Sequence, residues 1–209
     1  MKQLYIVIIL LLAGGTAMAT EEPRYEVLQQ FEAFELRRYA SQLLAETEVI
    51  GDFDDVGNQA FRILADFIFG NNREQEKISM TAPVIQQPGA GEKIAMTAPV
   101  TQTPKAGGGH GTYMFSFVMP ASYTRATLPQ PLDPRVRIRE VPARLMAARR
   151  YSGSWSEVRY RVQEAMLLRS VSQAGLTTDG APVYARYNSP FSLWFLRRNE
   201  VLIEVARKS

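Results

Sequence analysis

The sequence of 209 residues contains no cysteine and only one histidine, His110. The absence of cysteine excludes disulfides, thiol nucleophiles and thiolate metal sites. A single imidazole leaves few ways to build a metal centre or a histidine-based catalytic site. No catalytic triad and no phosphate-binding loop is recognisable in the rest of the chain. The sequence therefore predicts a protein that is not an enzyme.

The chain also lacks an apolar run of the roughly 20 residues that a membrane-spanning helix needs. A shorter run, Leu4–Ala13, follows Lys2 and precedes the small-residue pattern at residues 17–19, Ala-Met-Ala. This order is typical of a secretory signal peptide. We therefore expect residues 1–19 to be removed and the mature protein, from about Thr20, to be periplasmic without a membrane span. The alternative is an uncleaved segment that anchors the protein in the inner membrane.

Composition favours one globular domain over residues 20–209, because 46% of the chain is hydrophobic and 22% is charged. The net charge of +3 conceals an uneven distribution: residues 21–76 carry 13 acidic and 5 basic side chains, whereas residues 120–169 carry 10 arginines and 4 acids. Clustered arginine can bind nucleic acid, but export argues against that partner. Two interpretations stay open for the arginines: a solvated, partly self-paired face, or a surface that attracts carboxylates.

Two segments resemble each other when the chain is shifted by 102 residues. "FELRRYASQLLAETEVIGDFDDV" at residues 34–56 then lies on "VRIREVPARLMAARRYSGSWSEV" at residues 136–158 without a gap. The aligned pairs include Arg37 with Arg139, Leu43 with Leu145, Gly51 with Gly153 and Phe53 with Trp155. We interpret the match as an internal duplication. Two strand–strand–helix halves related by a pseudo-two-fold axis predict an α+β fold, a distorted antiparallel β-barrel or sheet with two α-helices.

The hydrophobic pattern predicts the same elements in each copy. The predicted elements are strands near Phe34–Leu36 and Leu43–Ile50 with a helix over Asp55–Phe69, then strands near Val136–Ile138 and Leu145–Tyr151 with a helix over Ser156–Gln173. Acidic residues at Asp54 and Asp55 suit the positive end of the first helix.

An eight-residue motif occurs twice, as "KISMTAPV" at residues 77–84 and as "KIAMTAPV" at residues 93–100. Turn residues separate the copies, and a residue before proline favours extended backbone. We therefore expect both copies to be strands, with Met80 and Met96 buried in them; the alternative is that these thioethers bind iron. A further strand is predicted over Thr112–Pro120, with alternate aromatic residues on one face.

The chain resembles the SOUL/heme-binding protein family over about residues 25–205. The resemblance rests on the doubled MTAPV motif, "FSFVMP" at residues 115–120, "LPQPLDPRVRIREVP" at residues 128–142 and "YNSPFSLWFLRRNEV" at residues 187–201. It implies a distorted β-barrel with two helices and an internal pseudo-repeat. It also implies binding of heme or other tetrapyrroles. In such a fold the MTAPV segments would be sheet strands rather than a cofactor-binding motif.

The resemblance further implies an apolar groove between the first helix and a loop near the C-terminus. The helix is apolar on two faces, so we expect the sheet to cover one and another segment to cover the other. The loop "SPFSLWFL" at residues 189–196 is the segment expected opposite it. By position, the expected ligand-binding residues are Asn58, Phe61, Arg62, Leu64, Ala65, Ile68, Phe191, Leu193, Trp194 and Arg197.

We expect no side chain to bind the iron strongly. His110 lies in the glycine-rich stretch "GGGHG", which holds an axial ligand poorly; a solvated loop histidine is the simpler interpretation, and axial ligation is the alternative. Relatives carry basic side chains at helix positions that read Asn58 and Asp66 here. Arg62 and Arg197 are the candidate replacements for those cations.

The sequence thus predicts a monomeric protein that binds heme, or another porphyrin, non-covalently and without a strong axial ligand. Two alternatives remain open at this point. One is a binding module for another flat apolar small molecule. The other is an envelope protein whose Trp194 loop binds a partner protein.

Overall fold

The computed structural model describes residues 20–73, 91–105, 111–188 and 192–207. The elements are β1 (Tyr25–Gln30), β2 (Glu35–Tyr39), β3 (Gln42–Ile50), α1 (Val56–Ile68), β4 (Asn72–Arg73), β5 (Val100–Pro104), β6 (Thr112–Val118), β7 (Gln130–Pro131), β8 (Arg137–Val141), β9 (Arg144–Tyr151), α2 (Glu157–Gln173), β10 (Leu176–Arg186), the 3-10 turn η1 (Trp194–Leu196) and β11 (Asn199–Arg207). The predicted helices are confirmed to within one residue at each end.

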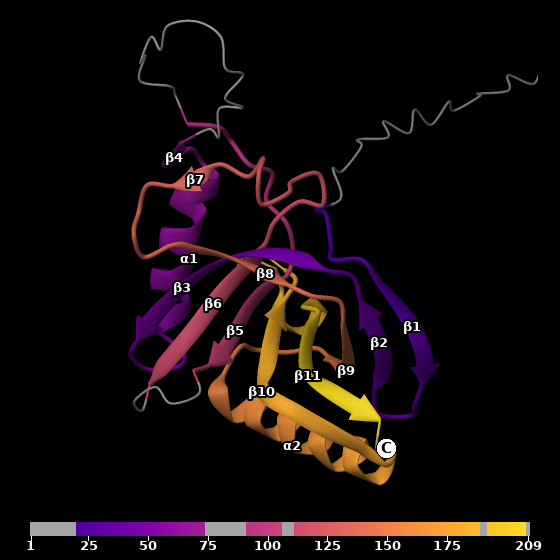
Figure 1. The fold of residues 1–209 in the computed structure, drawn as a ribbon. Coiled ribbons are helices and arrows are strands. Elements are labelled where there is room, and N and C mark those ends of the chain that lie inside the picture. Colours follow the sequence, from indigo (N-terminus) through magenta and orange to yellow (C-terminus); the bar gives the residue numbers. More distant parts are fainter. Residues whose placement is uncertain (1–19, 74–90, 106–110, 189–191, 208–209) are drawn as a thin grey trace, which may run out of the picture.

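Nine strands form one antiparallel sheet in the order β1-β2-β9-β11-β10-β5-β6-β3-β8 (Figure 1). Strands β4 and β7 form a separate two-stranded ribbon. Because β1 and β8 are the two edges of the large sheet, it is open. Of the two predicted forms, barrel or sheet, the structure therefore adopts the sheet.

The strand pairing confirms the internal duplication. The first strands of the two copies, β2 and β8, begin 102 residues apart, and so do the second strands, β3 and β9. Each first strand pairs with the second strand of the other copy: β2 with β9, and β8 with β3. The register is also repeated, since Arg37 lies opposite Met146 and Arg139 lies opposite Leu44. Each half of the repeat therefore pairs its first strand with the second strand of the other half.

Glycine ends the second strand of each copy for a conformational reason. Gly51 has φ +153° and Gly153 has φ +133°, values that residues with a side chain rarely adopt. A Cβ on Gly51 would also lie 2.9 Å from Val56 Cγ1, in the first turn of α1. Glycine thus permits the sharp change from strand to helix that both copies share.

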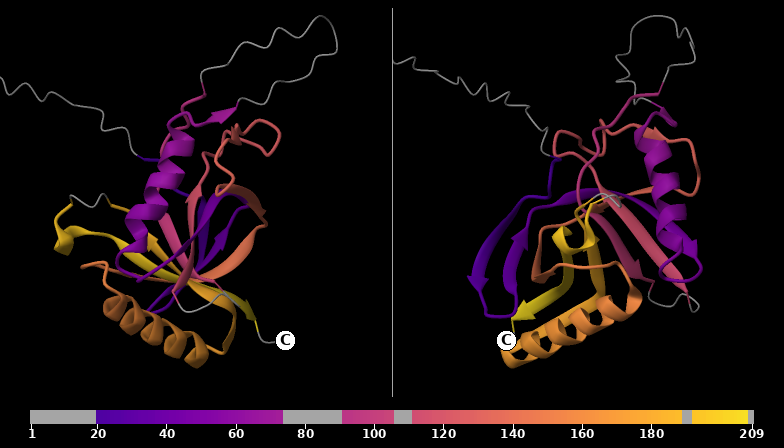
Figure 2. Two further views of the ribbon diagram at one scale, coloured as in Figure 1. Left: turned by 90° about the vertical axis from the view of Figure 1, so that its left-hand side faces the viewer. Right: turned by 180° about the vertical axis from the view of Figure 1, so that it is seen from behind.

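Both helices cover the same face of the sheet (Figure 2). Helix α1 packs on β3 and β6, and α2 packs on β9, β10 and β11. Side chains of both helices and of the inward strand positions form one hydrophobic core. The opposite face has a smaller cluster, which consists of Tyr39, Met146, Ala148, Ala185 and Leu202. Neither described helix offers an apolar stretch of the length that a membrane span requires.

The second copy of the repeated motif differs from the prediction. Residues 93–99 do not form a strand: Thr97 makes a single bridge to Glu21, and β5 begins only at Val100. Met96 is 40% exposed, so the prediction that it is buried in a strand is wrong. The physical reason is that the chain bends at Ala98 and enters the sheet only at Val100, so that Met96, which precedes the bend, lies outside the sheet.

Thr97 shows what the motif does in this place. It is buried, and its hydroxyl donates a hydrogen bond to the carbonyl oxygen of Val118 at the end of β6. The second copy is therefore architectural, as predicted, although it is not a strand. The first copy, with Met80, lies outside the described residues. The aromatic strand is confirmed as β6, with Tyr113, Phe115 and Phe117 buried on one face.

Candidate ligand-binding site

Helix α1 turns most of its apolar residues into the protein. Leu64 and Ile68 are members of the main core, and Ala65 is buried as well. Of the helix positions predicted to line a groove, only Asn58, Phe61 and Arg62 reach the surface. Leu64, Ala65 and Ile68 therefore lie beneath this surface.

Residues 92–94 lie against the C-terminal end of α1. The backbone N–H of Ile94 donates to the carbonyl of Ile68 at 2.8 Å, and Ile94 is a buried core residue. Asn72 Nδ2 donates to the carbonyls of Phe67 and Glu92, both at 2.8 Å. The expectation that residues 189–196 cover the second apolar side stays a prediction, because residues 189–191 lie outside the described part of the chain. The hydrophobic pattern required a cover without specifying its source.

Phe61 sits at the boundary between core and surface. Its ring centroid lies 5.6 Å from that of the buried Phe117, at an angle of 59°. The side chain remains 38% exposed. One side of the ring thus packs on β6, while the other is available to a ligand.

The turn that contains η1 exposes four consecutive apolar residues, Leu193, Trp194, Phe195 and Leu196. Each is between 52% and 67% exposed. The rings of Trp194 and Phe195 meet edge to face with centroids 5.6 Å apart. In the left view of Figure 2 the turn projects on the side of the sheet that the two helices cover. Apolar residues gathered in this way on a surface are typical of a binding site.

Residues that follow the turn anchor it to the start of α2. The Arg197 guanidinium lies 4.3 Å from the centre of the Trp155 ring, and Arg197 Nε donates to the carbonyl of Ser192. Trp155 Nε1 donates to Asn199 Oδ1 at 2.8 Å, and Asn199 Nδ2 donates to the carbonyl of Gly153. These contacts hold the exposed turn in place through Trp155 and the buried Asn199.

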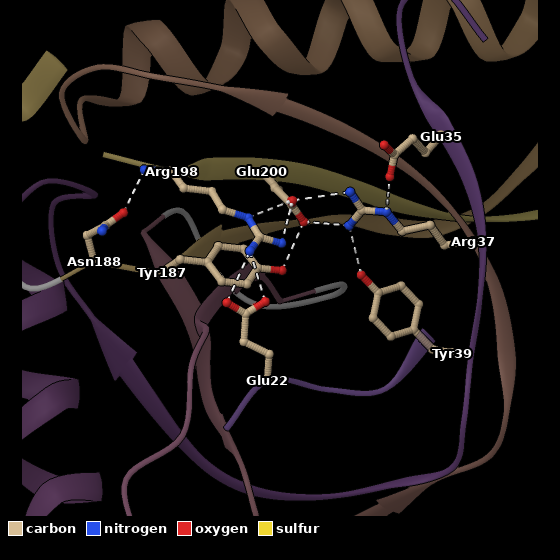
Figure 3. A network of polar contacts seen from close by, with 8 residues as sticks. All are labelled: Glu22, Glu35, Arg37, Tyr39, Tyr187, Asn188, Arg198 and Glu200. Carbon is tan, nitrogen blue, oxygen red and sulfur yellow. Dashed lines mark hydrogen bonds and ion pairs between the residues drawn. The ribbon is translucent and has the colours of Figure 1, made fainter. Parts of the chain in front are cut away.

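Arg198 and Glu200, which follow Arg197 in the sequence "RRNE", belong to an ion-pair network on the other face of the sheet (Figure 3). Glu200 is fully buried and accepts hydrogen bonds from Arg37 at 2.7 and 3.2 Å, and from Tyr187 at 2.9 Å. Arg198 bonds Glu200 and also pairs with Glu22 near the N-terminus at 2.8 Å. Every residue of "RRNE" thus fastens the turn to another part of the molecule.

Arg186, at the end of β10, connects the turn with α1. Its Nη2 donates to Gln102 Oε1 at 2.6 Å and its Nε donates to Tyr160 Oη at 3.1 Å. The guanidinium lies 5.2 Å from the centre of the Trp155 ring. On the other side, a Cβ on Gly57 would lie 2.9 Å from Arg186 Nη1. Arg186 therefore joins the first turn of α1 to Trp155 and so to the exposed turn.

Sequence reasoning missed both Arg186 and Trp155 as members of this site. A signal existed for each. Trp155 is aligned with the buried Phe53 in the internal repeat, and Arg186 is a charged residue in the otherwise uncharged stretch "APVYARYN". Neither signal indicates that the two side chains meet, because they are far apart in the sequence.

The charges on the exposed face of α1 are engaged locally. Arg62 Nε donates to the carbonyl of Asn58 at 3.3 Å. Asp66 accepts a hydrogen bond from Asn71 Nδ2 at 2.6 Å, beyond the end of the helix. Asp66 is therefore bound at the C-terminal end of α1, away from the first turn, where Gly57 adjoins Arg186.

A hollow of about 350 Å³ lies elsewhere, between the N-terminal segment and the end of β6. Its wall includes Glu21, Glu22 and Glu140 beside Arg24 and Arg125, and none of the predicted binding residues. Its carboxylates make it a poor match for an acidic apolar ligand. We therefore take the surface between α1 and the turn as the candidate site.

The described residues contain no group of three or more His, Cys, Asp or Glu side chains arranged to hold a metal ion. Two of the predicted residues lie outside the described residues: His110, the alternative axial ligand, and Phe191 of the loop.

An open antiparallel sheet of two exchanged strand–strand–helix halves, with an exposed apolar turn, defines a duplicated α+β binding fold. The profile of the SOUL heme-binding protein family matches residues 20–90 and 86–204. The chain belongs to this family of binding proteins. Its membership supports binding of a tetrapyrrole in general terms.

Individual proteins agree with this placement. Human heme-binding protein 2 (Homo sapiens) is 27% identical over 201 residues, which cover 89% of this chain and 90% of that protein. Among solved structures, the EcmrR C-terminal domain has a TM-score of 0.60 at 11% identity and covers 88% of this chain and 99% of its own. A hydrolase from Listeria innocua has a TM-score of 0.55 at 11% identity, with 86% and 94% covered. These two structures show the shared fold alone.

Proposed function

We propose that this protein binds heme or a related tetrapyrrole non-covalently on the surface between α1 and the η1 turn, without a strong protein axial ligand. The observation that carries the proposal is the exposed run Leu193–Leu196, anchored on Trp155 and joined by Arg186 to the first turn of α1. We further propose that the protein acts as an exported, periplasmic monomer.

The chemistry of this surface suits a flat apolar molecule. Trp194 and Phe195 meet edge to face, so one of the two rings can stack on a porphyrin plane while the other meets it with an edge, and the exposed side of Phe61 adds further aromatic surface. Apolar contact stabilises such a complex by roughly 25 cal/mol for each Å² removed from water, before the cost of association. Exposed ion pairs contribute only about 0–1 kcal/mol each. Leu64, Ala65 and Ile68 act from below, since they pack the helix on the core.

Hemin titration followed by the Soret band tests the proposal. Trp194→Ala should weaken binding about five- to hundred-fold, because it removes aromatic contact worth roughly 1–3 kcal/mol. Phe61→Asp should weaken it more, since it places an unpaired charge on the same surface. Ile50→Ala is the matched control, because Ile50 is also an exposed apolar residue but lies at the end of β3.

The thermal stability of each variant distinguishes a binding surface from a packing role. Trp194→Ala should keep the wild-type melting temperature because Trp194 is largely exposed. His110→Ala should leave the Soret position unchanged if the iron has no protein ligand. Wild-type hemin affinity in both surface variants would remove this surface from the site. Absence of any hemin binding by the wild type would favour the two alternatives, another flat apolar ligand or a partner protein.

A further inference from the structure

Helix α2 exposes apolar side chains along its outer side. Val158, Val162 and Met166 are 76%, 52% and 44% exposed. They are spaced four residues apart, so they form one stripe along the helix. The residues of α2 that are buried in the core lie on the opposite side of the helix and are Tyr160, Leu167 and Val171. The helix is therefore apolar on two sides, and the described part of the fold covers only one of them.

Arginine side chains surround this stripe. At about 3.6 residues per turn, Arg159 and Arg161 fall on opposite sides of it, and Arg169 continues it towards the end of α2. All three residues are exposed. From β9, Arg149 Nη2 donates to the sulfur of Met166 at 3.7 Å. Arginine can lay its apolar stem along an apolar surface and hold its charge at the rim, so the stripe has a cationic border.

The carboxylates of α2 are bound on one side of the helix. Glu164 is only 17% exposed, and it accepts hydrogen bonds from Tyr184 Oη at 2.7 Å and from Arg161 Nη1 at 3.1 Å. Glu157 accepts from Arg161 Nη2 at 3.2 Å. These are the two acidic residues of α2, and neither is three or four positions from Arg159 or Arg169. The outer side of α2 therefore presents apolar side chains together with net positive charge.

The helix is placed where it can lie on a flat surface. Figure 1 shows α2 along the lower edge of the molecule, and both views of Figure 2 show it in the same position. Its 17 residues span about 25 Å. Three side chains cannot cover the roughly 800 Å² per partner that a stable protein interface buries. A narrow apolar stripe bordered by cations suits the boundary between lipid headgroups and acyl chains, where an amphipathic helix lies parallel to the bilayer.

We propose that α2 is a membrane-contacting helix, which holds the protein reversibly on the surface of a bilayer that contains anionic lipids. The apolar stripe enters the boundary of the acyl chains to a shallow depth, and the arginines bind lipid phosphates. This inference is independent of the proposed function, because it uses no residue of the tetrapyrrole surface. It gives a role to three of the ten arginines in residues 120–169.

Sedimentation with lipid vesicles tests the proposal. The protein is the chain that begins at Thr20, which contains every described element and lacks the apolar run Leu4–Ala13. Binding to vesicles of equal parts phosphatidylglycerol and phosphatidylcholine should be about tenfold tighter at low salt than binding to phosphatidylcholine alone. Raised salt should release the protein, since the charges on α2 are exposed.

Two variants of α2 separate the apolar contribution from the cationic one. Val162→Asp should weaken binding to the anionic vesicles about tenfold, because it places a charge in the stripe. The double variant Arg159→Gln, Arg169→Gln should weaken it at least about tenfold, because two contacts with lipid phosphate are lost. All three positions are exposed, so the melting temperature should stay close to that of the wild type.

Matched controls make the same changes away from α2. Ile50→Asp alters an exposed apolar residue at the end of β3. The double variant Arg135→Gln, Arg137→Gln removes two exposed arginines at the start of β8. Both controls should keep nearly the wild-type affinity for anionic vesicles.

The absence of cysteine from the chain allows a second measurement. A polarity-sensitive fluorophore attached to Val162→Cys should shift its emission to the blue when anionic vesicles are added. The same fluorophore on Ile50→Cys should not shift. Leu193→Cys is the third position, because Leu193 in the turn that contains η1 is 59% exposed and offers lipid another apolar contact.

The results decide which surface meets the lipid. A blue shift at Leu193→Cys without one at Val162→Cys, or wild-type vesicle binding by both α2 variants, would overturn the inference. Absence of wild-type binding to anionic vesicles at low salt would also overturn it, and would leave a partner protein as the occupant of the outer side of α2. The proposed function stands or falls separately, by the hemin titration.

Discussion

At the scale of single residues, the pair Arg37–Glu200 is the most deeply buried charge in the described structure. The two side chains are 3% and 0% exposed and 2.7 Å apart. Burial alone lowers the pKa of Arg37, but the hydrogen bonds and charge of Glu200 outweigh burial and raise it. Burial alone raises the pKa of Glu200, but Arg37, Arg198 and Tyr187 hold it below its ordinary value. Both groups are therefore charged in the folded protein at neutral pH.

Tyr39 and Tyr187 also belong to this network, because Tyr39 accepts a hydrogen bond from Arg37 and Tyr187 donates one to Glu200. Burial raises the pKa of Tyr39 to about 12, although the charge of Arg37 acts in the opposite direction. Burial, followed by the charge of Glu200, raises the pKa of Tyr187 as well. Both phenols consequently stay neutral and act as hydrogen-bond donors or acceptors for the ions.

Glu200→Gln should lower the free energy of unfolding by about 3 kcal/mol at pH 7, because it removes the buried carboxylate that Arg37 and Arg198 share and leaves Arg37 only the partly exposed Glu35 as a counter-ion. The pKa of Glu200 is lowered in the folded state, so its stabilising effect is fully present above its ordinary pKa of 4.5 and is lost as pH falls through the lower folded value. Urea unfolding of wild type and variant at several pH values measures this difference.

The gap between wild type and Glu200→Gln should thus be widest near neutral pH and should narrow below about pH 4. Glu26→Gln is the matched control, since Glu26 pairs with Arg38 on the surface, where both side chains are more than half exposed. It should change stability little. A gap of constant size across this pH range would contradict the role of the Glu200 charge.

At the scale of elements, the two helix starts are linked through Asp54. Its Oδ1 accepts a hydrogen bond from the backbone N–H of Glu157, the first residue of α2, at 3.0 Å. The residue before α2, Ser156, makes no side-chain capping bond. Asp55 precedes α1 and likewise makes none. The acidic pair was predicted to serve the first helix, whereas Asp54 caps the second.

Asp54→Ala should therefore destabilise the protein by about 1 kcal/mol, the usual value of a helix-capping hydrogen bond, and thermal unfolding should show a lower melting temperature. Asp55→Ala is the adjacent control and should have a smaller effect, because its side chain makes no capping bond. Equal losses in the two variants would show that the local charge, rather than the bond to α2, is responsible.

At the scale of the whole molecule, the N-terminal segment is tied to the body immediately after the expected cleavage point. Glu21 Oε1 accepts from the backbone N–H of Ala121 at 2.9 Å, and Glu22 pairs with Arg198 at 2.8 Å. A protein that begins near Thr20 would retain both contacts.

We expect the mature protein to begin close to Thr20, because the pattern Ala17-Met18-Ala19 suits a signal peptidase. N-terminal sequencing of protein from the envelope fraction measures this directly. Ala19→Asp should block cleavage and accumulate the longer precursor. An intact Met1 on membrane-bound wild-type protein would establish the alternative, an uncleaved anchor.

Much of the architecture was predictable because it is periodic. The alternation of apolar residues along β6 predicts which of its side chains are buried, and the apolar faces of α1 do the same for the helix. The alignment of Gly51 with Gly153 in the sequence indicates the duplication. The prediction that Met96 is buried in a strand was wrong because its local sequence suits a strand, whereas the chain bends at Ala98 before it enters the sheet. The contact of Ile94 with the C-terminal end of α1 could not be deduced, since many apolar segments of the chain would serve equally well.

The sequence by itself determined the family, the two-fold repeated plan and the presence of an apolar loop near the C-terminus, because local patterns and motifs encode each of these. Only the tertiary structure decided that Leu64 and Ile68 are core residues, that Asp54 caps α2, and that Arg186 and Arg197 share Trp155. The physical reason is that these contacts join strands and helices distant in the chain. Their geometry follows from the exchanged pairing of the two halves, which no local pattern specifies.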